Sequence, residues 1–248
     1  MEFLRNLFGK KINAGDFSRL ATDMHSHLLP GIDDGSENME TSIALIRELK
    51  KQGFRKLITT PHVMGDQYRN TSDIIMNGLH ELNHTLASHA DISDMQVTAA
   101  AEYYLDAEFI EKLQSEKLLT MGDNFLLVEI SYLNCPENFF DLADLILASG
   151  YRLILAHPER YPYWHGRTDI YGKMKSKGVF FQINLNSLSG YYGPQVKRAA
   201  ETLIDLHHVE FAGTDVHHAR HTHALASCTA SAHFEKILDS GKLLNGIL

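Results

Sequence analysis

The first candidate site is a short run near the start of the chain, Asp23-Met24-His25-Ser26-His27. In an extended strand, residues two apart point to the same side, so His25 and His27 can hold one metal ion together. Such a pair is only moderately specific, because a single histidine at a strand end is more often a hydrogen-bonded core residue. The pair gains weight only if other ligand types gather near it.

Other segments also place a histidine or a carboxylate directly after an apolar run. They are Thr59-Thr60-Pro61-His62, Ala101-Glu102, Val128-Glu129, Ala156-His157-Pro158-Glu159-Arg160 and Gly213-Thr214-Asp215-Val216-His217. Any one of them could mark only the point where the chain reaches water, but all follow a predicted strand. Imidazoles and carboxylates buried so close together would be poorly solvated without cations. The pattern predicts a cluster of two or three divalent metal ions.

The elements that must position these residues are short apolar strands alternating with helical patterns. Strands are predicted to end near His25, Thr60, Ala101, Ile130, Ala156, Asn184 and Gly213. Most lack polar alternation, which is typical of strands buried on both faces. Helices are predicted over residues 39–49, where Gly53 supplies the stop, and over 72–88, 138–149, 196–206 and 222–234.

This alternation predicts right-handed βαβ units and a parallel α/β sheet. Seven units favour a closed or nearly closed barrel, whose active site would lie at the C-terminal ends of the strands. The 248 residues and 44% apolar composition suit a single barrel. With no linker or shift in composition, residues 1–248 are expected to form one domain, with residues 1–17 as an N-terminal extension.

Charge and composition limit the classes of partner. The formal net charge of −8 is unfavourable for binding a phosphate backbone, so no nucleic-acid partner is expected. Two cysteines are too few for a disulfide framework and indicate reduced thiols in the cytoplasm. No apolar run is long enough to span a bilayer. A short amphipathic turn with Phe3, Leu4, Leu7 and Phe8 could touch a membrane or a partner, or pack on the barrel.

The motifs together resemble the PHP (polymerase and histidinol phosphatase) superfamily, and within it the bacterial protein-tyrosine phosphatases of capsule and exopolysaccharide synthesis. The matching pieces, from residue 23 to 217, are D-M-H-S-H-L-L-P-G-I-D-D-G-S, T-T-P-H, A-E-Y-Y, L-L-V-E-I, A-H-P-E-R-Y and G-T-D-V-H. D-D-G and H-P-E-R separate this branch from histidinol phosphatases and polymerase-linked PHP domains. The resemblance implies a distorted (βα)7 TIM-like barrel of the PHP type with a trinuclear site.

The resemblance also implies a ligand set. One ion would be held by His25, His27, Glu102 and Asp215; a second by Glu102, Glu129 and His157; and a third by Asp34, His62 and His217. Asp33, next to Asp34, is the alternative ligand at that position.

The same resemblance implies that Arg160 is catalytic and binds phosphate. Either His157 or a metal-bound water could assist departure of the leaving group. Arg220 is the nearest match for an arginine that follows the last metal motif in relatives. Three further histidines after the last predicted strand, His218, His221 and His223, could overhang the site.

These residues suit hydrolysis of a phosphate monoester. Divalent ions lower the pKa of bound water to about 7 and supply hydroxide for in-line attack on phosphorus. Arg160 is a planar, permanently charged fork that fits two phosphate oxygens. Imidazole and carboxylate ligands without thiolate suit Mn, Fe or Zn, and the resemblance favours Mn. Neither Cys135 nor Cys228 has an arginine six residues later, which argues against a cysteine-based phosphatase.

The implied function is a cytoplasmic, metal-dependent protein-tyrosine phosphatase acting on a bacterial tyrosine kinase of polysaccharide export. A small-molecule phosphatase for histidinol phosphate or a sugar phosphate is an alternative, as is a protein that binds metal without turnover. A related amidohydrolase or nuclease is a third, although the lysine expected on its middle strand is replaced by Glu129. Aromatics near the site, which could form a rim for an aryl phosphate or pack the barrel, are Tyr103, Tyr104, Tyr161, Tyr163 and Trp164. The oligomeric state is not predicted.

Overall fold

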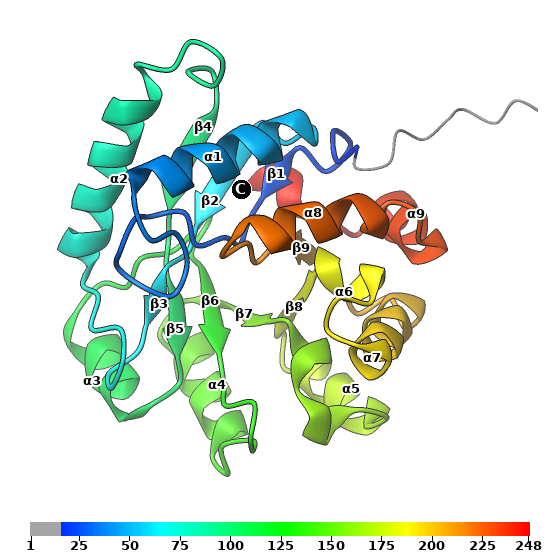
Figure 1. The fold of residues 1–248 in the computed structure, drawn as a ribbon. Helices are drawn as coiled ribbons and strands as arrows, with labels where there is room; N and C mark the ends of the chain where they lie inside the picture. The colour runs from blue at the N-terminus through cyan, green and yellow to red at the C-terminus, as the bar shows by residue number, and fades with distance from the viewer. Residues whose placement is uncertain (1–15) are drawn as a thin grey trace, which may run out of the picture.

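The computed structural model describes residues 16–248, and its strands lie at the centre with helices packed around them (Figure 1). The predicted amphipathic turn lies outside the described residues. The strands are β1 (Thr22–Asp23), β2 (Lys56–Thr59), β3 (His62–Val63), β4 (Gln96–Ala99), β5 (Glu102–Tyr104), β6 (Phe125–Glu129), β7 (Arg152–Ala156), β8 (Phe180–Asn184) and β9 (Phe211–Gly213).

The helices follow the strands along the chain. They are α1 (Met39–Lys51), α2 (Ser72–Leu86), α3 (Ala107–Ser115), α4 (Phe139–Ala148), α5 (Thr168–Ser176), α6 (Leu185–Ser189), α7 (Pro194–Asp205), α8 (Ala219–Cys228) and α9 (Ala232–Asp239), with 3-10 turns η1 (Pro158–Arg160), η2 (Pro162–Trp164) and η3 (Asn245–Ile247).

The strands pair in parallel in two sheets, ordered β1-β2-β4 and β3-β5-β6-β7-β8-β9. The predicted second and third strands are each divided between the sheets, as β2 and β3 and as β4 and β5. The first division falls at Pro61, which has no N–H for the ladder. The prediction of a parallel α/β fold is therefore confirmed.

Closure of a barrel depends on contacts between the first and the last strand. The first and last strand segments meet at one parallel bridge, between Ser26 and Val216. Backbone hydrogen bonds flank it, from His27 N to Val216 O at 2.9 Å and from Asp215 N to His25 O at 2.7 Å. Because the described strands are assigned to two sheets, the (βα)7 barrel stays a prediction.

Most predicted helices are present, as α1, α2, α4 and α7. Gly53 follows α1 with a φ of +104°, and a Cβ there would lie 2.7 Å from Ser18 N, so glycine is required. The prediction of one helix over residues 222–234 is wrong. Helix α8 ends at Cys228, and a separate helix, α9, begins at Ala232. The Ser231 side chain caps α9 by accepting a hydrogen bond from His233 N–H.

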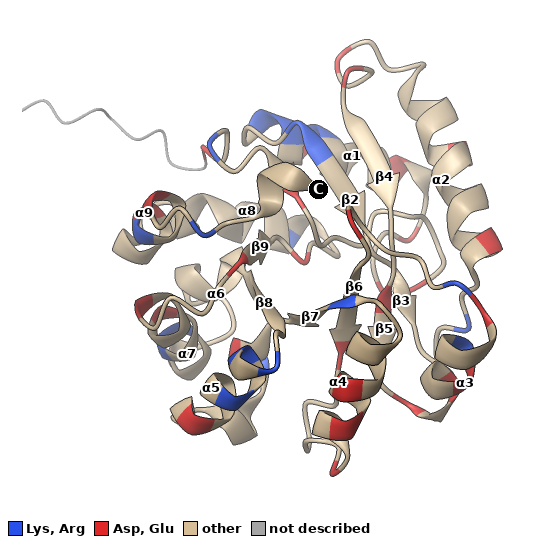
Figure 2. Ribbon diagram, turned by 180° about the vertical axis from the view of Figure 1, so that it is seen from behind, with Lys and Arg blue, Asp and Glu red and all other residues tan. Residues whose placement is uncertain are grey.

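Buried apolar side chains from the strands and inner helix faces form the core. Phe17, at the end of the predicted N-terminal extension, is fully buried and stacks on Phe54 at 5.1 Å between ring centroids. Charged side chains of both signs occur on outer helices such as α5 and α7 (Figure 2). Within residues 16–248, no helix is both long and apolar enough to cross a membrane.

Candidate metal centre

The predicted ligands converge where β1, β6, β7 and β9 end and where the short strands β3 and β5 begin. Two follow β1, one begins β3, one begins β5, one ends β6, one follows β7 and two follow β9, while the remaining one lies in the loop before α1. In that order they are His25, His27, His62, Glu102, Glu129, His157, Asp215, His217 and Asp34. Side chains that come from distant parts of the chain therefore share one small volume.

The first group joins the β1 histidines to two carboxylates. His25 Nε2 lies 3.3 Å from both Glu102 Oε2 and Asp215 Oδ1. His27 Nε2 lies 3.5 Å and 3.4 Å from the same two oxygens. Adjacent ligands of an ion with bonds of about 2.0–2.2 Å should be roughly 3–3.6 Å apart. The spacing fits a shared cation.

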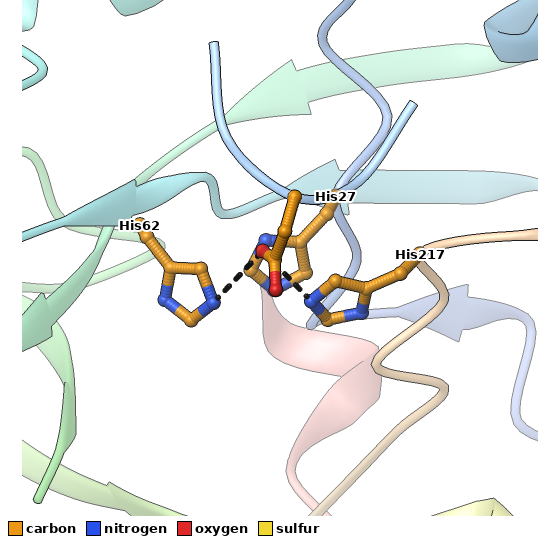
Figure 3. Close-up of side chains that lie close together, drawn as sticks. His27, His62 and His217 are labelled. Atoms are coloured by element: carbon orange, nitrogen blue, oxygen red, sulfur yellow. Dashed lines mark ion pairs between the residues drawn. The ribbon is translucent and has the colours of Figure 1, made fainter. Parts of the chain in front are cut away.

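The second group surrounds Asp34. Its Oδ1 lies 3.4 Å from His62 Nε2 and 3.5 Å from His217 Nε2, and Figure 3 shows these two imidazoles close to that of His27, each with a dashed line that marks an ion pair. His27 belongs to the same set of nearby ligand atoms, and its ring stacks on His217 with centroids 3.9 Å apart. His27 thus lies between the first and second groups.

In the third group, the two carboxylate oxygens of Glu102 face different histidines. Its Oε1 lies 3.2 Å from His157 Nε2, whereas its Oε2 lies 3.1 Å from His62 Nδ1. Glu129 is also near, with Oε1 3.6 Å from His157 Nε2. By proximity, His62 groups with both glutamates, and His157 with His25 and Asp215. This grouping overlaps with, but does not reproduce, the apportioning that the resemblance implies.

The chemistry of these donors fits divalent cations. Glu102 is fully buried, yet neither of its carboxylate oxygens has a hydrogen-bond partner in the described structure, nor does His62 Nδ1. A buried carboxylate without hydrogen bonds is costly unless a cation or another charge compensates it. All donors are nitrogen or oxygen, which suits Mn, Fe or Zn.

Electrostatics support the same interpretation. Burial opposes protonation of His25, but Glu102 and Asp215 outweigh burial and raise its pKa to about 9. Burial is the largest influence on His157 and lowers its pKa to about 4. The carboxylates therefore create a potential that favours cations, and neutral His157 keeps a lone pair for a metal.

Asp33 has a different surrounding from Asp34. Its Oδ2 lies 2.8 Å from His27 Nδ1 and accepts from His62 N–H at 3.1 Å. Burial favours the neutral form of Asp33, but the imidazole of His27 outweighs it and lowers the pKa. A carboxylate on the far nitrogen fixes the ring orientation of a metal-binding histidine. Asp33 therefore supports His27, while Asp34 faces the ligand group.

Two amides on β8 were missed by the sequence analysis. Gln182 Oε1 lies 2.9 Å from His25 Nδ1, and Asn184 Nδ2 donates to Asp215 Oδ2 at 2.6 Å. Both are fully buried. The available signal was the presence of two amides in an otherwise apolar strand, since buried polar groups need partners.

The backbone is strained at two of the predicted ligands. His157 has φ 32° and Asp215 has φ 51°, both in the left-handed region that costs about 1–3 kcal/mol for such residues. His157 directly follows β7, and Asp215 comes two residues after the end of β9. The turns aim their side chains into the cluster.

Gly35 packs directly on the backbone that carries His27. A Cβ at Gly35 would lie 2.4 Å from both His27 Cβ and His27 O, and backbone atoms cannot move aside cheaply. We expect Gly35→Ala to displace His27 and to weaken metal binding by about 10- to 100-fold, as for loss of a ligand's support. Metal content after dialysis, with circular dichroism as a check on folding, measures this.

Gly172→Ala is the matched control, because a Cβ there meets nothing within 4 Å. That variant should keep the wild-type metal content. Equal metal retention by the two variants would show that the contact between Gly35 and His27 is unimportant.

The ligands open into a pocket of about 340 Å³. Arg160 lines it, and its Nη1 donates to Asp215 Oδ2 at 2.9 Å. His218 and His221 also line the pocket, whereas the exposed Arg220 and His223 are not among its lining residues. The role of Arg220 therefore stays a prediction.

None of the five aromatic residues considered from the sequence lines the pocket. Tyr103, Tyr161 and Trp164 are buried in the core, in line with the packing alternative. The pocket is lined instead by Tyr68, Tyr132 and Tyr192. No spacing pattern marked these three, because they come from separate loops.

Neither cysteine lines the pocket. Cys228 is buried, and burial raises the pKa of its thiol and that of Cys135. Thiol chemistry therefore has no support at this site.

Comparison with known proteins gives one family and several relatives. The family described as "Capsular polysaccharide synthesis, CpsB/CapC" matches residues 21–239. The chain is 29% identical over 199 residues to the tyrosine-protein phosphatase YwqE of Bacillus subtilis, covering 80% of this chain and 78% of YwqE. It is 25% identical over 201 residues to the tyrosine-protein phosphatase CpsB of Streptococcus agalactiae, covering 79% and 82%.

Two solved structures are also similar. One comes from work on YwqE from Bacillus subtilis and CpsB from Streptococcus pneumoniae, described as unique metal-dependent tyrosine phosphatases. It matches with a TM-score of 0.74 and 28% identity, over 87% of this chain and 84% of the other. The lactonase Lmo2620 from Listeria monocytogenes matches with a TM-score of 0.51 and 11% identity, over 90% and 88%, a likeness of fold alone.

Proposed function

The chain belongs to the CpsB/CapC family of capsular polysaccharide synthesis, and from this premise we propose that it is a metal-dependent protein-tyrosine phosphatase. The observation that carries the proposal is the buried cluster of imidazoles and carboxylates around Glu102, whose two oxygens have no hydrogen-bond partner in the described structure. Relatives named tyrosine-protein phosphatases supply the reaction class.

The proposed metal ligands are those of the sequence analysis. His25, His27, Glu102 and Asp215 would hold one ion; Glu102, Glu129 and His157 a second; and Asp34, His62 and His217 a third. Bound divalent ions would acidify water and neutralise charge on a phosphoryl group. We favour Mn, with Fe and Zn as alternatives, because the ligands are nitrogen and oxygen.

The chain's own residues bind and orient the substrate. Arg160 presents a guanidinium, about one quarter exposed, beside Asp215 at the pocket wall. Such a fork can hold two phosphate oxygens through charge-assisted hydrogen bonds. His157 is held neutral by burial, so we assign it to ligation more than to proton donation. A phenolate leaving group, with a pKa of about 10, needs less acid assistance than an alkoxide.

The pocket walls favour an aromatic substrate over a sugar phosphate. Tyr68, Tyr132 and Tyr192 line it. Stacking of such a ring on a phenyl group stabilises a complex by about 0.5–1.5 kcal/mol beyond the effect of burying the surface. We therefore propose phosphotyrosine in a protein as the substrate, and a bacterial tyrosine kinase in the cytoplasm as the partner. We also propose one domain over residues 1–248 and a distorted seven-unit barrel, which the Ser26–Val216 bridge supports.

Metal removal tests the proposed function. Protein stripped with a chelator should release no phosphate from a phosphotyrosine peptide, and added Mn should restore release, because the ligand cluster depends on cations for charge balance. Phosphate release with and without Mn, Fe and Zn is the measurement. A histidinol phosphate and a sugar phosphate, tested in parallel, address the small-molecule alternative. Metal uptake without turnover of any phosphate ester would contradict the proposal.

A further inference from the structure

Tyr192 lies against the guanidinium that the mechanism requires. It follows α6 and lines the pocket, and Arg160 Cζ is 4.3 Å from its ring centroid. A second ring, that of Tyr132, lies 4.8 Å from the same carbon. Cation–π contacts of this kind contribute about 0.5–2 kcal/mol when desolvated. The two tyrosines and Asp215 therefore restrict where the Arg160 fork can point.

The hydroxyl of Tyr192 makes no hydrogen bond within residues 16–248. It is buried, and no hydrogen-bond partner for it exists in the described structure. Buried tyrosine hydroxyls usually have a partner, because an unpaired polar group in an apolar setting is costly. His218 Nδ1, on another residue of the same pocket wall, is also buried without a partner. Unpaired polar atoms on the pocket wall point to a polar ligand there.

We propose that Tyr192 binds substrate: its ring orients Arg160, and its hydroxyl donates a hydrogen bond to an oxygen of the phosphoryl group that Arg160 holds. This inference rests on the proposed function and extends it. Tyr192 is not a metal-ligand candidate, so its loss should leave the ions in place. Burial raises the pKa of Tyr192, which keeps the hydroxyl protonated and able to donate.

Three variants separate the ring from the hydroxyl. Tyr192→Phe removes only the donor, and Tyr192→Leu removes the ring beside Arg160 as well. Tyr191→Phe is the matched control, because Tyr191 precedes it, is 40% exposed and is not a lining residue of the pocket. All are compared as Mn-loaded, full-length protein.

Two readouts are needed, one of which does not depend on turnover. The first is the Kd of inorganic phosphate by calorimetry, and the second is KM and kcat for a phosphotyrosine peptide. We expect Tyr192→Phe to weaken phosphate binding and to raise KM about tenfold, the effect of a hydrogen bond to a charged group. Tyr192→Leu should also lower kcat, since Arg160 loses its support. The metal content of all three variants should match that of the wild type. Tyr191→Phe should also match the wild type in Kd, KM and kcat.

The outcomes distinguish this inference from the function on which it rests. If wild-type protein releases phosphate and Tyr192→Phe equals it in Kd, KM and kcat, the role of Tyr192 is refuted and the function stands. If wild-type protein binds phosphate through Tyr192 but hydrolyses no ester, the function fails and the binding role stands. A loss of metal in Tyr192→Phe would also overturn the inference, since it would indicate a structural role.

Discussion

Replacement of Arg160 by alanine is expected to lower kcat for a phosphotyrosine peptide by about 100- to 1,000-fold, the usual effect of removing one donor to developing charge. The reason is geometric. Arg160 is the arginine of the pocket wall, and Asp215 and two tyrosine rings hold its guanidinium in place. A flexible lysine should recover only part of the rate, because it lacks the planar fork.

Metal content should survive this substitution. Asp215, the residue that Arg160 contacts, also accepts from Asn184 Nδ2 at 2.6 Å, so its carboxylate stays oriented. Arg167→Ala is the matched control: that arginine is 55% exposed and pairs with Asp169. Steady-state kinetics measures the turnover of the variants, and elemental analysis measures their metal content. Wild-type turnover in Arg160→Ala would remove Arg160 from the mechanism.

Glu102→Gln is expected to lose bound metal and activity together, with metal affinity falling by at least about 100-fold. Glu102 contributes to two of the ligand groups and is fully buried without hydrogen bonds. Burial would raise its pKa, but His25 and His62 outweigh burial and hold the pKa well below the ordinary range, so the carboxylate is charged. An amide of the same shape removes the charge that compensates the cations.

Glu159→Gln is a stringent control, because Glu159 is equally buried and belongs to the same H-P-E-R motif as Arg160. Burial raises its pKa to about 7, and Ser187 Oγ donates to it at 2.7 Å. It is not part of any ligand group in the described structure. This variant should retain its metal. Metal loss in Glu159→Gln but not in Glu102→Gln would reverse the assignment.

Strand positions were predictable because their signal is local. Short apolar runs such as Phe125–Glu129 and Arg152–Ala156 can be recognised without knowledge of their neighbours in the fold. The parallel pairing followed from the alternation with helices. The division of residues 56–63 between two sheets was not predicted, although Pro61 marks the break. The helix predicted over residues 222–234 failed because a serine cap interrupts an otherwise continuous helical pattern.

The residue types near the predicted strand ends can be read from the sequence, and they led to the prediction that His25, Glu102 and Asp215 share one site. The roles of neighbouring residues became visible only in the folded protein. It places Asp33 on the back of His27 and Asp34 among the ligand atoms, a distinction that adjacent identical residues cannot carry in sequence.

Tertiary structure also supplied the partners that stand far away along the chain. Gln182 reaches His25, and Tyr192 reaches Arg160, from strands and loops with no metal-ligand signature of their own. The type of each candidate ligand is a property of a single residue and its place near a strand end, so the sequence can predict it. Orientation and hydrogen bonding depend on contacts across the fold, which periodicity and composition do not encode.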